Sequence, residues 1–515
     1  MILPQISYNV PKSQNEIVQL RSIQYSDALQ DGDVAYSQNI SARRFPYITT
    51  RKQRARRGNY EAATAITAWG ALVAVEGTKV FYDGTAVTGS VTAGEKQFAV
   101  VNTKLVIWPD KKYLDLLTRE LKPLAASSTG SGATFAVDGN TMKMTVTWNV
   151  NFTTLFKEGD CVEITGSSIA ANNTFAIVSK VEAKKLYFTN KDAMEAGSAT
   201  GTIKIARDIP DLDFICESDN RLWGCSNADR TIYASALGDP TNFHTFEGLS
   251  TDSYAVAVGS EGDFTGCCKL SSSILFWKET VLHKMLGSMP SEYSIVTYTL
   301  DGLREGCSKS LQVINETLFY MGLHGVYAYT GGTPALISAN FGSKDFTNAV
   351  GGNDGDTYYL CVQDGEDYHL FAYETRYGIW VLEEDIQVKD FARIGKDLYM
   401  LMGSGQIWYA SDADITSNTE WFLQFTPFYE TIQGGKVYSK IMLRLQLPLG
   451  SYIIAETRQD GRPWEEAGKV YGNVENVAVM RIAVNRCDKF EIRLSGKGPC
   501  TILSMLRQFT VGSEV

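Results

Sequence analysis

The chain has 515 residues, of which 44% are apolar and 21% are charged. These values are ordinary for a folded protein, and the length gives room for two to four domains, each with its own core. The net charge of −10 argues against a protein that coats nucleic acid over its whole surface.

The cysteines and the apolar runs of the sequence further narrow the class of protein. The chain has nine cysteines and no CxxC pair, which argues against a zinc ribbon or finger. The first residues lack the charged and apolar regions of a signal peptide, so we expect maturation in a reducing cytoplasm with free thiols. No apolar run approaches the ~18 residues of a membrane-spanning helix, and we expect no membrane segment.

Residues 1–58 lack long strand alternation and concentrate positive charge. We predict an extended arm that lies on the rest of the protein or on a neighbouring subunit. Its basic residues are either solvated or ion-paired with an acidic subunit, or they face a lumen and touch DNA phosphates without reading bases. These candidates for contact with DNA or a subunit are Arg43, Arg44, Arg51, Lys52, Arg54, Arg56 and Arg57.

Residues 59–124 and 207–435 repeat one pattern, in which a polar turn precedes a short apolar strand, and a second turn precedes a strand ending in an aromatic residue. From about residue 270 the units recur at roughly 40 residues, the spacing of propeller blades. Such sheets bury both faces by packing radially. The pattern predicts a β-propeller of about six to eight blades, with a series of β-sandwiches as the alternative. TAITAWGALVAV at 64–75 is compatible with a helix or with a strand.

Residues 125–206 interrupt the repeat. They begin with the small-residue stretch AASSTGSGAT and continue with clean alternation at 142–148 and 174–178. This pattern predicts a small β-barrel or sandwich inserted between two blades, which is tolerated where the ends of the insert lie close together.

The last segment, residues 436–515, alternates most strongly. Ile441, Leu443, Leu445 and Leu447 fall on one face of a strand, and Met442, Arg444 and Gln446 fall on the other. We predict a terminal β-sandwich, so that the chain as a whole is all-β.

Signatures of catalysis are missing from the sequence. It contains no GxSxG elbow, no GxxxxGK[ST] phosphate loop and no GxGxxG after a strand. A paired-carboxylate glycosidase is the enzyme class that sequence excludes least, because such a pair is spatial and not sequential. We therefore predict no catalytic residue and no cofactor, and we expect that the protein is not an enzyme.

The sequence also gives little support for a metal site. Asp-rich turns occur at 354–356, 364–367 and 412–414, but the last lacks the central glycine and third acid of a calcium loop. Hairpin turn chemistry explains all three stretches. No HExxH or HxH pair occurs, and we predict no metal ligand among the four histidines His244, His283, His324 and His369.

Several motifs together resemble a family of propeller-bearing tail proteins of short-tailed bacteriophages, the tail nozzle and packaged-DNA stabilisation proteins. The most specific is RLWGCSNADRTIYASALGDPTNF at 221–243, a strand followed by a characteristic corner. The other similar segments are SARRFPYITTRKQR at 41–54, FKEGDCVEITGS at 156–167, DGRPWEEAG at 460–468 and RCDKFEIRLSGKG at 486–498.

The resemblance implies a structural virion protein located in the viral tail and assembled in the host cytoplasm. As a tail nozzle or tail hub it would form a homo-oligomeric ring, with six-fold symmetry implied by the resemblance alone. Its partners would be adaptor, fibre or needle proteins and passing double-stranded DNA, which the ring retains until DNA ejection. The alternatives are a receptor- or glycan-binding tail-tip protein and, behind it, a carbohydrate-active propeller enzyme.

Overall fold

The computed structural model describes residues 12–410, 419–473, 477–482 and 485–511. Within these ranges the regular elements are β-strands and five short 3-10 turns, with no α-helix. The chain divides into two compact units, residues 62–308 and residues 1–61 with 309–515. The stretch 64–75 is a β-hairpin, because Gly70 at φ 65° closes a tight turn between its two strands.

Residues 62–308 contain four antiparallel four-stranded sheets, each formed by strands that follow one another in the chain. We refer to such a sheet as a blade. The strands of the four blades are β5 (Ala63–Trp69), β6 (Ala71–Glu76), β7 (Lys79–Tyr82) and β8 (Thr85–Ala86); β9 (Gln97–Val101), β10 (Lys104–Trp108), β11 (Lys112–Asp115) and β12 (Glu120–Pro123); β19 (Phe214–Ser218), β20 (Arg221–Ser226), β21 (Thr231–Ala234) and β22 (Tyr254–Ala257); and β23 (Gly266–Leu270), β24 (Ser273–Trp277), β25 (Val281–Leu286) and β26 (Ser294–Thr299).

The other unit contributes three more blades. The third has three strands in the sheet order. The strands are β27 (Gln312–Ile314), β28 (Thr317–Gly322), β29 (Gly325–Tyr329) and β30 (Ala335–Leu336); β31 (Thr347–Asn353), β32 (Thr357–Asp364), β33 (Asp367–Glu374) and β34 (Ile379–Glu384); and β35 (Val388–Ile394), β36 (Asp397–Met402) and β37 (Ile407–Tyr409).

Burial changes in a regular way across the blades. The second strand is almost wholly buried, as in β20 and β24, where every residue is buried. The fourth strand is mostly exposed, as in β26 and β8. First strands of successive blades lie side by side within each unit, β9 with β19, β19 with β23, β27 with β31 and β31 with β35. A sheet buried on both faces along its second strand must pack against a neighbour on each side, which is the packing of β-propeller blades.

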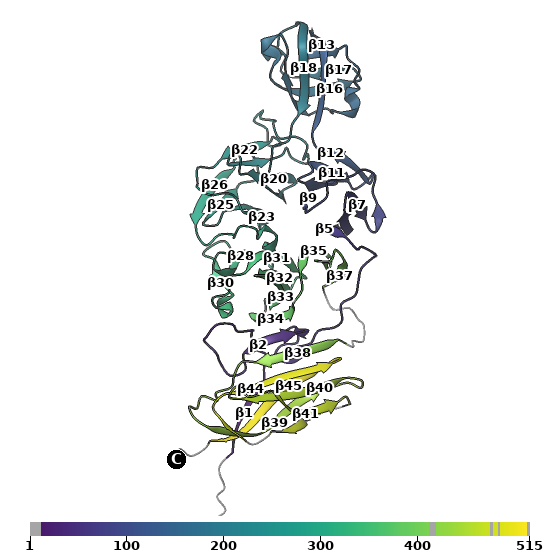
Figure 1. Ribbon diagram of the computed structural model, residues 1–515. Coiled ribbons are helices and arrows are strands. Elements are labelled where there is room, and N and C mark those ends of the chain that lie inside the picture. The colour runs from purple at the N-terminus through teal and green to yellow at the C-terminus, as the bar shows by residue number, and fades with distance from the viewer. Residues whose placement is uncertain (1–11, 411–418, 474–476, 483–484, 512–515) are drawn as a thin grey trace, which may run out of the picture. The chain divides into compact units, whose positions relative to one another are not determined.

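The insert between β12 and β19 is a closed β-barrel with the strand order β13-β14-β17-β16-β15-β18. Its own core includes Phe135, Met144, Phe152 and Ile164. Figure 1 shows the barrel joined to the blades of the same unit by the ends of its first and last strands. The strands are β13 (Ala126–Asp138), β14 (Thr141–Val146), β15 (Cys161–Thr165), β16 (Phe175–Glu182), β17 (Lys185–Phe188) and β18 (Gly197–Arg207), and 3-10 turns lie at Phe152–Thr154, Ala170–Asn172 and Lys191–Ala193.

The C-terminal part is a β-sandwich of two sheets, and its buried row is the predicted one, from Ile441 to Leu447. The seven-stranded sheet contains β39 (Lys436–Gln446), β42 (Val477–Arg481), β43 (Arg486–Cys487) and β45 (Thr501–Val511), together with β1 (Ser13–Ile17), β3 (Ile40–Ser41) and β4 (Ile48–Thr50). The five-stranded sheet contains β2 (Val34–Gln38), β38 (Glu420–Phe425), β44 (Phe490–Lys497), β40 (Tyr452–Gln459) and β41 (Glu465–Tyr471).

The N-terminal segment corrects our expectation of an extended arm. Four of its pieces are strands of the sandwich, so the sandwich starts at β38 and also includes residues from the other end of the chain. The physical reason is that β45 and β38 would otherwise present open edges, and the N-terminal strands satisfy their backbone groups.

The same segment completes the last blades of its unit. The amide of Arg57 donates to the carbonyl of Ile407, and the amide of Tyr409 donates to the carbonyl of Ala55, both at 2.8 Å. Residues 55–57 therefore take the place of a fourth strand beside β37. Residues 37–39 bond to β34 through Ser37 and Asn39, which explains why this outer strand is buried when the other fourth strands are exposed.

Candidate functional site

The seven basic residues of the predicted arm divide into a buried and an exposed group. Arg51 and Arg54 are 7% and 6% exposed, and Arg43 is half-buried. Arg44, Lys52, Arg56 and Arg57 are exposed. The segment bonds to β34 at residues 37–39 and to β37 at residues 55–57, so some of its side chains are buried against these strands while others stay exposed.

The inward group is held by carboxylates of the same chain. Arg54 pairs with Glu383, and its second terminal nitrogen lies 2.7 Å from Oε2 of Glu384. Arg51 reaches the same oxygen of Glu384 at 2.9 Å. These two arginines therefore join the N-terminal segment to the end of β34.

Two further arginines of the segment are also ion-paired. Arg43 pairs with Asp354 and donates to the hydroxyl of Tyr359 at 2.6 Å. The exposed Arg56 lies 2.5 Å from Glu61. Contact with DNA or with a subunit stays a prediction, and the exposed cations of the segment include Arg44, Lys52 and Arg57.

The segment 221–243 builds one blade and the corner that follows it. Arg221, only 1% exposed, donates to the carbonyl oxygens of Ser235 at 2.9 Å and Ser250 at 2.6 Å, and also to that of Asp252. A guanidinium carries five donors in a fixed fork, so one side chain can hold several carbonyls of an irregular loop. Arg221 thereby fixes the long loop between β21 and β22.

That corner, residues 235–244, makes the contacts that hold the inserted barrel against the blade. Asn242 donates to the carbonyl of Gly159 in the barrel at 3.0 Å, and Lys157 of the barrel lies 2.6 Å from Asp239 of the corner. The ring of His244 stacks on Phe175 with 5.1 Å between centroids. Three contacts of different kinds thus orient the barrel on one blade, and sequence reasoning assigned no such role to these residues.

A buried ion pair lies at the same junction. Arg207 pairs with Asp160, whose side chain is fully buried, and donates to the carbonyl of Leu124 at 3.0 Å. Burial raises the pKa of Asp160 even though Arg207 opposes the shift. Burial also acts on Asp239, but Lys157 and Lys104 outweigh it and lower the pKa of Asp239. The side-chain oxygens Oδ1 of Asp160 and Asn242 accept no hydrogen bond, which leaves acceptor capacity in this seam.

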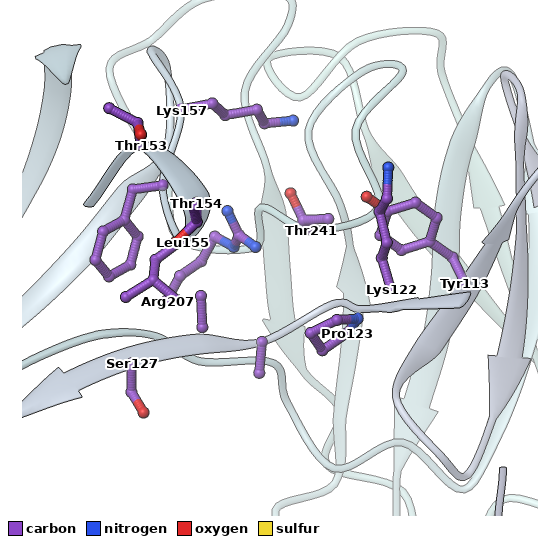
Figure 2. Close-up of a pocket in the computed structure, with 13 residues that line it drawn as sticks. Tyr113, Lys122, Pro123, Ser127, Thr153, Thr154, Leu155, Lys157, Arg207 and Thr241 are labelled. Carbon is purple, nitrogen blue, oxygen red and sulfur yellow. The ribbon is translucent and has the colours of Figure 1, made fainter. Parts of the chain in front are cut away.

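A cavity of about 540 Å³ opens where the barrel meets β11 and β12. Figure 2 shows Lys157 and Lys122 on opposite sides of Thr241, with Arg207 on the same side as Lys157. The rest of the lining combines apolar groups with the hydroxyls of Tyr113, Ser127, Thr153 and Thr154. Its size is within the range of small-molecule sites.

The described histidines do not converge on a site. In the described part of the chain, no three His, Cys, Asp or Glu side chains are grouped so that they could hold a metal ion. The Asp-rich turns 354–356 and 364–367 close the hairpins β31–β32 and β32–β33, whereas 412–414 lie outside the described residues. The nine cysteines are free thiols, and no helix within the described ranges is long and apolar enough to cross a membrane.

His283 supports a prediction about pH. It is 2% exposed in β25, with Nδ1 2.9 Å from the Thr297 hydroxyl and Nε2 2.7 Å from the Ser260 hydroxyl. Burial, helped by the nearby charge of Lys278, lowers the pKa of His283 from 6.5 to about 4. Because the folded pKa is below the unfolded value, the unfolded chain binds the proton first as the pH falls.

We therefore expect His283 to leave stability intact above about pH 6.5 and to reduce it progressively as the pH falls toward 4. Urea unfolding across this range measures the effect, and the His283→Gln variant should show a flatter pH dependence. His324→Gln, at an exposed histidine, is the control and should keep the wild-type slope. Equal slopes for wild type and His283→Gln would contradict the prediction.

Comparisons with known proteins identify no family. No model of a protein family matches the chain, and neither does any curated protein sequence. Among solved structures, BamB from Moraxella catarrhalis is 12% identical over 71% of this chain and 98% of that chain, with a TM-score of 0.36. Hsv2 from Kluyveromyces lactis is 11% identical over 57% of this chain and 73% of that chain, with a TM-score of 0.28. An exo-beta-1,3-galactanase from Phanerochaete chrysosporium is 10% identical over 56% of this chain and 92% of that chain, with a TM-score of 0.22. These scores support no functional argument.

Proposed function

We propose that the protein is a structural component of a bacteriophage tail, a nozzle or hub subunit that extends the DNA channel, retains the genome and releases it at infection. The starting point is the resemblance of its motifs to propeller-bearing tail proteins. The order of the parts, with blades, an inserted barrel and a terminal sandwich, agrees with that resemblance.

The observation that carries the proposal is the place of the most specific motif in the fold. Residues 221–243 form β20, β21 and the corner that seats the barrel. Their conspicuous polar groups, Arg221, Asp239 and Asn242, are used to hold neighbouring segments. A motif with that role serves architecture, which is what a subunit of a tail assembly requires.

The proposed mechanism is mechanical. Identical subunits close into a ring when a heterologous contact repeats with a rotation that closes, and the resemblance implies six of them. A net charge of −10 gives the chain an overall repulsion for phosphates, which would let DNA slide without adhering. Arg44, Lys52 and Arg57 would supply the few sequence-independent contacts, and adaptor, fibre or needle proteins would bind the outer faces.

Negative-stain electron microscopy tests this proposal. The purified protein is imaged at rising concentration and again after mixing with tails that lack it, and the expected result is a ring with a central hole in at least one of the two samples. Monomers in both samples would overturn the proposal. Turnover of a glycan that is lost on replacing a single carboxylate would instead favour the carbohydrate-active enzyme.

A second candidate is a receptor- or glycan-binding protein of the tail tip. The cavity beside Lys122 and Lys157 is the observation that favours it.

A further inference from the structure

The cavity at the base of the barrel has walls from two parts of the same unit. Lys122 and Tyr113 come from β12 and β11 of a blade, whereas Thr154, Leu155 and Lys157 come from the barrel. The contacts of Asn242 and Asp239 with the barrel hold these two walls in place. A ligand in this space would therefore touch both parts at once.

Positive charge is only partly neutralised there. Lys157 uses one acid, Asp239 at 2.6 Å, and a lysine ammonium has three donors. Lys122 has no acid closer than 3.5 Å, with Glu120 at that distance and Asp115 at 3.8 Å. Arg207 donates to Asp160 and to the carbonyl of Leu124 and is only 7% exposed, so the more accessible donors belong to the two lysines. Both can turn toward an anion between them.

The remaining lining has the mixture that sugars require. Leu155 and Pro123 supply an apolar wall for the C–H face of a ring, and the hydroxyls of Thr153 and Thr154, which donate to Asn151, can accept hydrogen bonds at its polar edge. Tyr113 lies against the core of its blade with Lys104 over its ring at 5.7 Å. The ring of Tyr113 is thereby engaged within its own blade.

We propose that this cavity binds an acidic saccharide, with its carboxylate or phosphate held between Lys122 and Lys157. A volume of about 540 Å³ accommodates a disaccharide, whereas a DNA duplex is far too wide to enter. This inference goes beyond the proposed role in tail architecture, because closure of a ring does not require a sugar site. It assigns to the base of the barrel the recognition of a charged glycan.

Calorimetric titration of the full chain tests the proposal. The probes are digalacturonate, its neutral counterpart digalactose, inorganic phosphate and a short single-stranded DNA. The variant is Lys122→Gln, which removes the loosely paired ammonium and leaves the contact of Lys157 with Asp239 in place. The matched control is Lys191→Gln, a half-buried barrel lysine outside the cavity lining.

We expect digalacturonate to bind at least about tenfold more tightly than digalactose, and Lys122→Gln to weaken it by about tenfold while Lys191→Gln has no effect. Inorganic phosphate that binds as tightly as digalacturonate would overturn the saccharide assignment, and so would DNA binding that only Lys122→Gln abolishes. Equal binding by wild type and Lys122→Gln would overturn the site itself. Unchanged thermal unfolding of Lys122→Gln makes a binding loss attributable to the lysine, and ring formation by that variant tests the architectural role separately.

Discussion

Replacing Glu430 by alanine is expected to lower the free energy of unfolding of the sandwich by about 3–5 kcal/mol. The Glu430 and Arg507 side chains are 0% and 2% exposed, and two bonds of 2.6 Å and 3.0 Å join them. Asn15 also donates to Glu430 at 2.6 Å, and Arg507 lies over the ring of Phe428. Removing the carboxylate leaves a guanidinium buried without its counter-charge, which costs far more than the pair contributes.

Urea unfolding of the full chain, with hydrogen exchange read at the amides of β39 and β45, measures this loss. Glu456→Ala is the control, because its pair with Arg493 has side chains 24% and 28% exposed and should cost about 1 kcal/mol or less. Replacing Glu430 by leucine and Arg507 by methionine together should recover most of the stability, since two apolar groups need no partner. Equal losses of unfolding free energy for Glu430→Ala and Glu456→Ala would contradict the prediction that breaking the buried pair costs more than breaking a half-exposed pair.

The second large effect is expected at Arg54. Arg54→Met should destabilise the unit of residues 1–61 and 309–515 by about 3 kcal/mol or more, because a buried ion pair is broken and Glu383, which is 5% exposed, loses the guanidinium of Arg54. The loss should also free residues 55–57 from the edge of β37. Protection of the Tyr409 amide, which donates to Ala55, should therefore fall more than protection inside β36.

Arg56→Met is the matched control two positions along. The Arg56–Glu61 pair has side chains 33% and 66% exposed, so this substitution should cost about 1 kcal/mol or less. If both variants lose the same stability, or if the Tyr409 amide keeps its protection in Arg54→Met, the segment does not depend on the buried pair.

Much of the fold follows from local sequence. The second strand of a blade contains a continuous apolar run, such as LWGC within β20 or ILFW within β24, because both of its faces are covered. In β39 apolar and polar residues alternate because only one face of the strand is covered, and this alternation predicts the sandwich. In both patterns a few consecutive residues show which faces of the strand are covered. The blades, the insert and the sandwich can therefore be predicted from the sequence.

The N-terminal strands carry no such pattern. In β1, SQNEI, only Ile17 is buried, because this edge strand contributes mainly backbone hydrogen bonds to β45. β3 and β4 have two and three residues, too few to show a period. The pairing of Arg54 with Glu383 joins positions 329 apart, and no local signal relates them. From sequence alone, the basic run therefore predicts contact with DNA or with another subunit, although its buried arginines form ion pairs with acidic residues of the same chain.

The cavity escapes prediction for a related reason. Lys122 and Lys157 are ordinary surface lysines in sequence, and only the seating of the barrel on the 235–244 corner brings them to one space. The corner itself stands out in sequence through its resemblance to tail proteins, but the partner it holds lies more than 80 positions earlier. Sites formed by an inserted domain and its host depend on contacts of this kind.

The pairing of β1 with β45 has a consequence for biosynthesis. Ser13 lies opposite Phe509, about 500 positions later, so at about 5–20 residues per second a ribosome makes the partner roughly 25–100 seconds after the first strand. During that interval the nascent N-terminal segment has neither the sandwich nor the last blades to dock on. Blades and barrel in residues 62–308 can fold meanwhile from neighbouring strands, whereas the other unit must wait for translation to reach its final strand.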